Sequence, residues 1–392
     1  MKSLKNLPFL EDIEGEHGEA FLVGGAVRDD FLNKSCKDFD LLITKVPQDV
    51  LLEILKQHGK VNEVGKSFAI IKFKAFDSPE DEEPFDIAIP RTEVKNGTSH
   101  TDFIVTSNPW LPIEKDLERR DFTINAIARD IITNNIVDPF NGIQDLLDKK
   151  IRVLNDQSFN DDPLRMLRAV QFAARFNFEI EEETFKQIQK NAHLIKDVSK
   201  ERVLEEFQKI IKKGNPKLGV SLLVETGLFF ELFGFHFRGR LESFDQITNL
   251  AEFFFCLCQN HTDQIHQIFK NTFRGDINNT KEIKALEMLK TAIHDKGLMQ
   301  SRKIIFNALQ IWPKVVDTKI FVPLLGRLSG FRFGDFPTSF KELAVNGDDF
   351  IELGIQGEKL GKVRDEVLNT ILEKQIDFQD KQTLIDIIKS KI

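Results

Sequence analysis

Residues 21–43 read FLVGGAVRDDFLNKSCKDFDLLI, and this stretch decides how the N-terminal part of the chain is expected to fold. Its apolar beginning predicts a strand, the glycine pair predicts the start of a helix, and DFDLLI predicts a second strand. Gly24 and Gly25 leave room for backbone amides to approach phosphate oxygens, and the positive end of the helix dipole points the same way. The turn, together with Arg28 on the helix, is therefore a candidate phosphate-binding site.

Carboxylates follow on the second strand. Asp38 and Asp40 lie two residues apart, so in an extended strand both side chains leave the same face. Two carboxylates so close repel each other unless a cation lies between them, and Mg²⁺ is a hard, oxygen-ligated ion that suits this need. Asp86, in the strand-like run 85–89, is the expected third ligand of a catalytic metal site. The alternative for this DxD pattern is a strand with two solvent-facing aspartates.

A second polar cluster, residues 116–125 (DLERRDFTIN), adds candidates for binding a nucleotide. Arg119 and Arg120 have planar guanidinium groups that suit phosphate. Asp121 and Asn125 are four residues apart and share a face if the segment is helical, where an acceptor and an amide suit a ribose hydroxyl. The alternative is a charged helix start, with Asp121 near the cap and Arg119 in a surface ion pair.

These two stretches resemble the first two motifs of the class II tRNA nucleotidyltransferases, the family of the CCA-adding enzymes and the related bacterial poly(A) polymerases. Three more segments resemble the remaining motifs of that family, in the same order. They are DPFNGIQDL (138–146), DDPLRMLRAVQFAA (161–174) and VSKERVLEEF (198–207). A later segment, LAVNGDDFIELG (343–354), is similar to the tail domain of bacterial CCA-adding enzymes, which favours CCA addition over poly(A) addition.

The resemblance implies an α+β fold, in which a polymerase-β-like nucleotidyltransferase head with a mixed sheet precedes an all-α remainder. It divides the chain into a catalytic head (1–137), a helical neck with the nucleotide-selecting motif (138–213), a helical body (214–335) and a tRNA-binding helical tail (336–392). Apolar periodicity predicts strands at 20–23, 39–44, 68–74, 85–89 and 102–105, and a hairpin at 131–137. It predicts helices at 47–57, 164–176, 183–195, 201–212, 218–233, 245–258, 281–292, 300–311, 338–344, 358–374 and 382–391.

The fourth motif of the family uses an acidic residue and an arginine as a template for the base. The matching residues here are Asp162 and Arg165, three apart on one expected helical face, and Arg168 is assigned to the same nucleotide site. An acceptor and a set of donors match the base edges of cytosine and adenine, whereas G and U present the opposite pattern. The alternative is that Asp162 caps a helix starting at Pro163, unless Asp161, which stands where the family usually has Glu, provides the cap.

Two other regions carry expectations about RNA. Residues 94–101 match a segment that is a flexible loop in the family and helps the switch from adding C to adding A, and a simple surface loop is the alternative. Lys186 to Lys217 carry a local surplus of basic residues that is able to follow an RNA backbone. Within it Lys209, Lys212 and Lys213 are the predicted RNA contacts, and the alternative is a solvated helix face.

Composition limits the other possibilities. The chain has 392 residues and a net charge of −8, which argues mildly against indiscriminate nucleic-acid binding. No apolar run approaches the about 20 residues of a membrane span, and the three cysteines lack zinc-type spacing, so we expect a cytoplasmic protein without a membrane partner. There are 36 Phe and no Tyr, so no role here depends on a phenolic hydroxyl. The oligomeric state is not indicated.

The sequence therefore predicts an enzyme that adds CCA to tRNA 3′ ends from CTP and ATP by two-metal nucleotidyl transfer, with release of pyrophosphate. The expected partners are tRNA, CTP and ATP, and the expected cofactor is Mg²⁺. A poly(A) polymerase and an enzyme that adds only CC or only A are the nearest alternatives. An RNA-binding protein without catalysis is a further one, although binding alone needs no metal-holding carboxylates.

Overall fold

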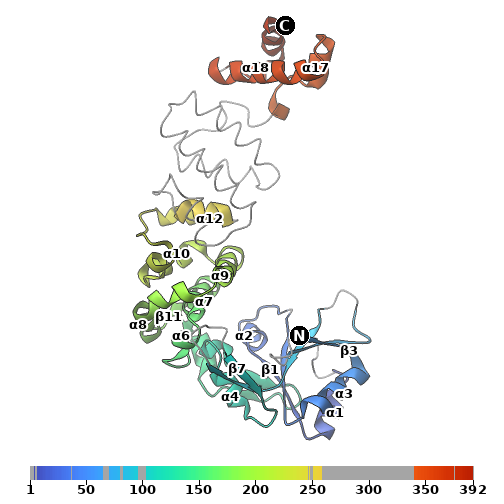
Figure 1. Cartoon of the computed structure of the whole chain (residues 1–392), viewed down its shortest axis with the longest axis vertical. Helices are drawn as coiled ribbons and strands as arrows, with labels where there is room; N and C mark the ends of the chain where they lie inside the picture. Colours follow the sequence, from blue (N-terminus) through green and yellow to red (C-terminus); the bar gives the residue numbers. More distant parts are fainter. Residues whose placement is uncertain are drawn as a thin grey trace. The chain divides into compact units, whose positions relative to one another are not determined.

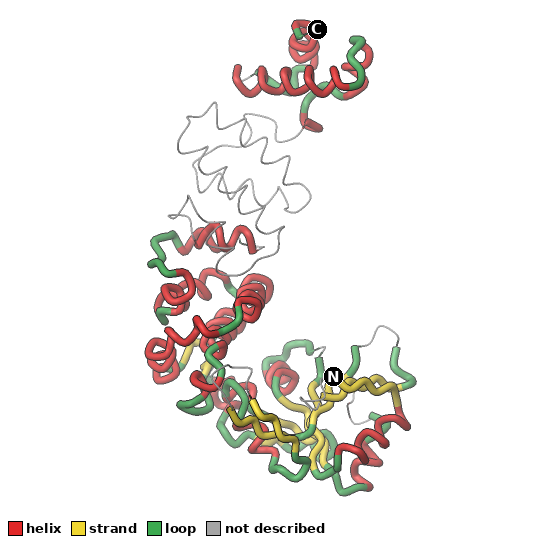
Figure 2. Tube along the Cα trace, viewed as in Figure 1, coloured by secondary structure: helices red, strands yellow, loops and turns green. Residues whose placement is uncertain are grey.

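The computed structural model describes residues 4, 7–36, 38–64, 70–79, 83–95, 103–245, 247, 250–257, 340–374 and 376–391. The chain separates into two compact units, Met1–Gly234 and Phe235–Ile392. The course of the chain is shown in Figure 1 and its helices and strands in Figure 2. Each unit is described by itself.

A mixed seven-stranded sheet forms the base of the first unit, with the strand order β3-β4-β5-β2-β1-β8-β9. Neighbouring strands are antiparallel except β2 and β5, which are parallel. The strands are β1 (Glu19–Val23), β2 (Asp40–Thr44), β3 (Gly59–Val64), β4 (Ile70–Ala75), β5 (Phe85–Ala88), β8 (Ala128–Asp130) and β9 (Ile136–Val137). Two smaller sheets join β6 (Arg91–Lys95) to β7 (Phe103–Ser107) and β10 (Lys150–Ile151) to β11 (Glu179–Ile180).

The centre of the large sheet is apolar on both faces. β1 and β2 are buried over nearly their whole length, as expected for central strands covered on each side. Phe21, Val23 and Leu42 pack against Ile113 and Leu117 on one face. This packing fixes the ends of β1 and β2, from which the glycine turn and Asp40 emerge, close to one another.

Helices make up the rest of the first unit. They are α1 (Leu10–Gly15), α2 (Gly25–Phe31), α3 (Gln48–His58), α4 (Ile113–Glu118), α5 (Gly142–Leu147), α6 (Ser158–Asp161), α7 (Leu164–Phe176), α8 (Glu182–Asn191), α9 (Lys200–Lys213), α10 (Pro216–Glu225) and α11 (Leu228–Phe233). Short 3₁₀ helices occur at η2 (Thr123–Asn125) and η3 (Ala192–Asp197). Helix α7 is buried along most of its length and packs on α9 and α10, which makes it the central helix of this part.

The described part of the second unit is helical. Its elements are η4 (Leu241–Phe244), α12 (Leu250–Leu257), η6 (Phe340–Glu342), α17 (Gly347–Glu352), α18 (Glu358–Lys374) and α19 (Lys381–Ser390). Asn346 and Asp349 form a capping box at the start of α17, and α17, α18 and α19 enclose an apolar core that includes Phe350, Val367 and Leu384.

Most of the predicted elements are confirmed, including the α+β class, the strands of the head and the hairpin whose turn residue Asn134 has φ +64°. The predicted helix 218–233 is wrong as a single helix, because Gly227 has φ +80° and separates α10 from α11. The predicted helix 338–344 is only the 3₁₀ turn η6 in the described residues. The neck is not purely helical, since it contains β10 and β11.

Some expectations lie outside the described residues, namely the helices 281–292 and 300–311 and most of the loop 94–101. The start of that segment belongs to β6, and β7 begins soon after it. The four-part domain division stays a prediction. Among the residues the structure describes, no helix is long and apolar enough to cross a membrane.

Candidate nucleotide-binding and catalytic site

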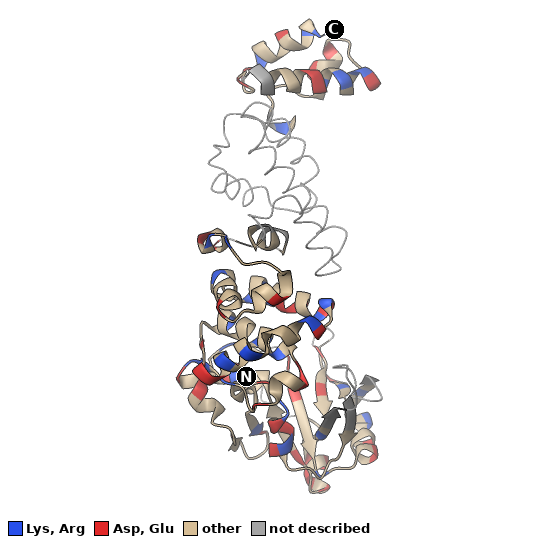
Figure 3. Cartoon of the chain, turned by 60° about the vertical axis from the view of Figure 1, so that its left-hand side comes forward, with Lys and Arg blue, Asp and Glu red and all other residues tan. Residues whose placement is uncertain are grey.

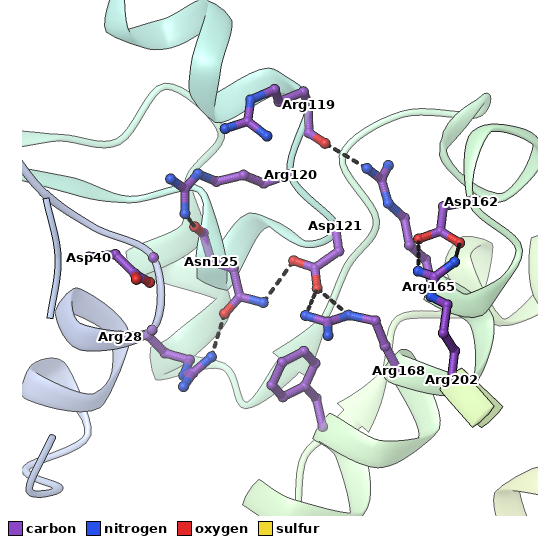
Figure 4. A pocket seen from close by; sticks show the side chains of 13 residues that line it. Arg28, Asp40, Arg119, Arg120, Asp121, Asn125, Asp162, Arg165, Arg168 and Arg202 are labelled. Carbon is purple, nitrogen blue, oxygen red and sulfur yellow. Dashed lines mark hydrogen bonds and ion pairs between the residues drawn. The ribbon is translucent and has the colours of Figure 1, made fainter. Parts of the chain in front are cut away.

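A cavity of about 390 Å³ opens in the first unit where the end of β1, the segment after α4 and helix α7 meet. Its volume lies in the range of small-molecule sites. Every one of the ten residues predicted from the sequence to bind a nucleotide lines this pocket, and Asp40, Phe172 and Arg202 line it as well (Figure 4). The ten are Gly24, Gly25, Arg28, Arg119, Arg120, Asp121, Asn125, Asp162, Arg165 and Arg168.

The glycine turn brings the backbone of Gly24 close to the side chain of Arg120. Gly24 has φ +69° and ψ −126°, a conformation that side chains with a Cβ rarely adopt. A Cβ on Gly24 would lie 2.5 Å from Nη1 of Arg120, which is too close for any real contact. Gly25 is less restricted, because a Cβ there would meet only Nη2 of Arg28, at 3.4 Å. The positive φ of Gly24 is therefore what favours glycine, and a Cβ there would also have to displace the end of the Arg120 side chain.

Arg28 is almost fully buried, at 4% exposure, on the inner side of α2. Its Nε donates to Oδ1 of Asp29 at 2.8 Å, its Nη1 donates to Oδ1 of Asn125, and its guanidinium lies over the rings of Phe172 and Phe176. Burial lowers the pKa of Arg28, and the charge of Asp29 opposes that shift. The side chain is thus a charged contact between the glycine turn and α7.

Asp121 joins the same network from the segment after α4. Nδ2 of Asn125 donates to its Oδ1 at 2.8 Å, and Nε and Nη2 of Arg168 donate to its Oδ2 at 2.9 and 2.6 Å. Burial by itself raises the pKa of Asp121, but the charge of Arg168 and the hydrogen bonds from Asn125 and Arg168 outweigh it and hold the pKa below its usual range. Asp121 and Asn125 meet as predicted, yet not along an α-helix, because Asn125 ends the 3₁₀ turn η2.

Asp162 and Arg165 also face the pocket, with a local structure that differs from the expected one. Asp162 precedes α7 in an extended conformation, and its Oδ1 accepts from the backbone N–H of Leu164, so the helix start is capped by Asp162 and not by Asp161. Both of its oxygens accept from Arg202, at 3.2 and 2.8 Å. The two residues therefore do not share one helical face.

Arg165 is fixed from two sides. Its Nη1 donates to Oγ of Ser158 at 2.8 Å, and its Nη2 donates to the backbone carbonyl of Arg119 at 2.6 Å (Figure 4). The second contact ties α7 directly to the arginine segment that borders the glycine turn. The side of the pocket formed by Asp162 and Arg165 is therefore connected by a hydrogen bond to the side formed by Arg119 and Arg120.

Of the three predicted metal ligands, Asp40 lines this pocket, whereas Asp38 and Asp86 are not among its lining residues. Asp40 and Asp86 occupy the same register on the parallel strands β2 and β5, so their Cα atoms are neighbours, at the usual strand spacing of about 4.8 Å. Oδ1 of Asp86 accepts from Nζ of Lys72 at 2.9 Å. Asp38 is exposed and lies before β2, so it is not brought into the strand pair as the DxD pattern implied.

The negative charges of Asp38 and Asp86 lie close enough to Asp40 to affect its pKa. Partial loss of hydration raises the pKa of Asp40 although its side chain is open to solvent, and the neighbouring charges of Asp86 and Asp38 add to that shift while Arg120 opposes it. In the part of the chain that the structure describes, no group of three His, Cys, Asp or Glu side chains is close enough to enclose a metal ion. The described residues thus place Asp40 and Asp86 on adjacent strands without a completed ligand set.

The predicted RNA contacts lie at the end of α9. Lys212 and Lys213 are exposed in its last turn, while Nζ of Lys209 donates to Oε1 of the buried Glu206 at 2.8 Å. Basic and acidic residues are interspersed over the helices of the first unit (Figure 3). The basic surplus is therefore partly used in ion pairs within the protein.

Three residues of this site were missed by the sequence interpretation. Each forms an ion pair with a charged residue of the pocket. Asp116 pairs with Arg119 and Arg120, and Arg202 pairs with Asp162. Glu206 faces Arg168. A signal was present only for Asp116, which precedes the two arginines by three and four residues, the spacing of neighbours on a helix.

Two family models match the chain. Residues 20–152 match the poly A polymerase head domain, and residues 177–236 match the probable RNA and SrmB-binding site of polymerase A. Among curated relatives, the CCA-adding enzyme of Ligilactobacillus salivarius is 28% identical over 97% of this chain and 95% of its own length. That of Lactococcus lactis is 34% identical, over 57% of this chain and about half of its own length (54%).

Solved structures share the fold. The Thermotoga maritima CCA-adding enzyme complexed with tRNA has a TM-score of 0.69 at 22% identity, over 98% of this chain and 93% of that one. The Bacillus stearothermophilus CCA-adding enzyme in complex with CTP has a TM-score of 0.64 at 22% identity, over 98% of this chain and 96% of that one.

The resemblance seen in the sequence is thereby confirmed. The chain is similar to the poly A polymerase head domain over residues 20–152 and, at 28% identity, to a CCA-adding enzyme over nearly its whole length.

Proposed function

We propose that this protein adds C, C and A without a nucleic-acid template to the 3′ ends of tRNA, using CTP and ATP. The observation that carries the proposal is the pocket that Asp40 lines. There the glycine turn and the Asp162–Arg165 pair converge with further arginines, which include Arg119, Arg120 and Arg168. Relatives of similar length are CCA-adding enzymes, and solved relatives hold tRNA or CTP. These names support CCA addition over the other activities of the family.

In the proposed reaction, the 3′-hydroxyl oxygen of the RNA forms a bond to the α-phosphorus of the nucleotide. The bond from that phosphorus to the oxygen bridging the α- and β-phosphates breaks, and pyrophosphate leaves with the electron pair. The hydroxyl proton is lost to the surrounding solvent. Positioning and electrostatic stabilisation are expected to supply most of the rate, as is general for transfer at phosphorus.

The residues at the edge of the pocket fit a divalent metal such as Mg²⁺. Asp40 and Asp86 are hard oxygen donors in register on adjacent strands, an arrangement that suits a divalent cation. The pKa of Asp40 is raised chiefly by loss of hydration, and the charges of Asp86 and Asp38 add to that shift. We infer that Asp40 and Asp86 hold the metal and that Asp38 contributes to it. When bound, such ions lower the pKa of the attacking hydroxyl and neutralise the triphosphate.

We assign the arginines of the pocket to different parts of the nucleotide. Arg119 and Arg120 lie on the Asp40 side of the pocket and are assigned to the phosphates, together with the backbone of Gly24 and Gly25. Arg28, Asp121, Asn125 and Arg168 line the same pocket and are joined by hydrogen bonds, and we assign them to the ribose side of the nucleotide. Arg168 and Asn125 already donate hydrogen bonds to Asp121. We therefore expect a ribose hydroxyl to donate to a lone pair of Asp121 that these bonds leave free.

Base choice is assigned to Asp162 and Arg165. A carboxylate has about four lone-pair positions, and the bonds from Leu164 and Arg202 leave about one of them for the amino group of cytosine or adenine. Arg165 uses one N–H on each terminal nitrogen for Ser158 and Arg119, so further N–H groups remain to donate to a ring nitrogen or carbonyl. The opposite pattern of G and U would leave these groups unpaired, which is costly.

We further propose that the helical remainder binds the tRNA, with Lys209, Lys212 and Lys213 near its backbone, and that the protein works in the cytoplasm. The four-part division into head, neck, body and tail belongs to this proposal. The nearest alternatives remain poly(A) addition and partial addition of CC or A.

One experiment separates these functions. The protein is incubated with Mg²⁺ and tRNA that lacks its 3′ CCA, with each nucleotide alone and with all four together, and the RNA ends are sequenced. The proposal expects C additions from CTP alone and a terminal CCA from CTP plus ATP. A run of A residues would instead show a poly(A) polymerase, and no incorporation would show an RNA-binding protein.

A further inference from the structure

Asp116 is a completely buried carboxylate, at 0% exposure, in the short helix α4 that leads into the pocket. It is not itself a lining residue of the cavity, but both of its oxygens are turned toward arginines that are. Oδ1 accepts from Nε and Nη2 of Arg119, at 2.9 and 2.7 Å, and Oδ2 accepts from Nη2 of Arg120 at 3.3 Å. One buried side chain thus holds two consecutive arginines.

This arrangement solves a physical difficulty. Two adjacent guanidinium groups repel each other, and each long arginine side chain loses rotamer freedom when it binds a ligand. A carboxylate between them offsets the repulsion and fixes the orientation of both guanidinium groups before a ligand binds. The side chains of Arg119 and Arg120 are 24% and 19% exposed, so each is held mostly inside the protein while it borders the cavity.

The neighbours of Arg120 show where the pair acts. Arg120 borders Gly24, its Nη1 lies 3.5 Å from the carbonyl of Asn125, and its charge reaches Asp40. Its buried Nε has no hydrogen-bond partner, so Asp116 and Asn125 are what orient it. The arginine pair therefore stands between the glycine turn and the proposed metal-binding carboxylate, where the triphosphate is expected.

We propose that Asp116 is a positioning residue that holds Arg119 and Arg120 side by side so that they bind the β- and γ-phosphates of the incoming nucleotide. This inference rests on the proposed function, because it assumes that the pocket takes a nucleoside triphosphate. Asp116 contacts neither the nucleotide nor the reacting atoms in this account, and it acts only through the two arginines.

The test compares how CTP and CMP bind to the full-length protein by calorimetry, in the wild type and in Asp116→Asn. The ratio of the two dissociation constants measures the contribution of the β- and γ-phosphates. We expect Asp116→Asn to reduce this ratio about tenfold, as for the loss of one or two charged hydrogen bonds, while the affinity for CMP changes less than about twofold. In the steady state, the KM for CTP should rise more than kcat falls.

Asp145 provides a matched control. It is also a buried aspartate, at 4% exposure, and it holds Arg152 and the hydroxyl of Thr123, but neither Asp145 nor Arg152 lines the pocket. Asp145→Asn should lower the melting temperature without changing the ratio of CTP to CMP affinity. If both variants lower the melting temperature and neither changes the ratio, Asp116 is merely structural and the inference is wrong.

Tighter binding of CTP to Asp116→Asn would also overturn the inference, because it would mean that the carboxylate only reduces the positive potential of the pocket. If Asp116→Asn fails to fold, Asp116→Glu keeps the charge and displaces the carboxylate by one methylene group. It should lower the same ratio while leaving the affinity for CMP unchanged, and an unchanged ratio would contradict the inference. A wild-type protein that binds CTP no better than CMP would instead contradict the proposed function.

Discussion

Arg168 donates two hydrogen bonds to a single oxygen of the buried Asp121 carboxylate, at 2.6 and 2.9 Å. The two residues are 47 positions apart in the chain. Arg168 is on α7 and Asp121 is in the segment after α4, so this ion pair joins these two sides of the pocket. Nη1 of Arg168 also lies 3.7 Å from Oε1 of the buried Glu206 on α9. The pocket is thus built around buried charges that are paired with each other.

This pair predicts a dependence of stability on pH. Because the pKa of Asp121 is lower in the folded protein than its ordinary value of about 3.9, its contribution to stability is fully present above that value and is lost as the pH falls through the folded pKa. We expect Asp121→Asn to lower the free energy of unfolding by about 3 kcal/mol at pH 7, because it removes the charged partner that accepts two hydrogen bonds from Arg168 and leaves only the more distant Glu206.

Urea unfolding of the wild type and Asp121→Asn between pH 7 and pH 3 checks this prediction. The difference in unfolding free energy between the two proteins should be constant from pH 7 to about pH 5 and should shrink below about pH 4. A difference that stays the same down to pH 3 would show that the charge of Asp121 does not stabilise the fold.

The glycine turn gives a second prediction. Gly24→Ala places a Cβ at a positive φ and against Arg120, so we expect CTP binding to weaken about tenfold or more. Gly25→Ala is the matched control, since a Cβ there meets only Nη2 of Arg28, at a tolerable 3.4 Å. Calorimetric titration with CTP should show a smaller loss for Gly25→Ala, and equal losses would mean that the tight approach at Gly24 has no part in binding.

Base choice gives a third prediction. Arg165→Lys removes the guanidinium group that donates to Ser158 and to the Arg119 carbonyl and that borders the proposed base site. We therefore expect incorporation of UTP or GTP relative to CTP to rise about tenfold. Arg152→Lys, an exchange outside the pocket, serves as the control. Incorporation is measured with each nucleotide alone on tRNA that lacks CCA. Selectivity that matches the wild type in Arg165→Lys would remove this residue from base choice.

Much of the pocket was predictable from the sequence, because the chemistry is local along the chain. Residue types indicated the turn at Gly24 and Gly25, whereas the arginines 119 and 120 and the Asp162–Arg165 pair were assigned with the help of the resemblance of their short segments to family motifs. The strands could be predicted for a similar reason, since β1 and β2 are apolar over nearly their whole length.

The rest depends on packing that no local pattern reveals. Arg202 reaches Asp162 only because α9 packs on α7, 40 residues away along the chain. The break at Gly227 was hidden because the apolar periodicity continues through it, whereas the backbone does not. Asp38 and Asp40 share a face only in an extended strand, and β2 begins at Asp40.

The central claim is that the pocket beside Asp40 adds CCA to tRNA. The most direct measurement sequences the 3′ ends of tRNA lacking CCA after incubation with CTP, ATP and Mg²⁺, for the wild type and for Asp40→Ala, with tRNA binding measured in parallel by filter retention. We predict that the wild type restores CCA and that Asp40→Ala adds nothing while it binds tRNA with an affinity within about threefold of the wild type. Nucleotide addition by Asp40→Ala at the rate of the wild type, or a wild-type product other than CCA, would contradict the account.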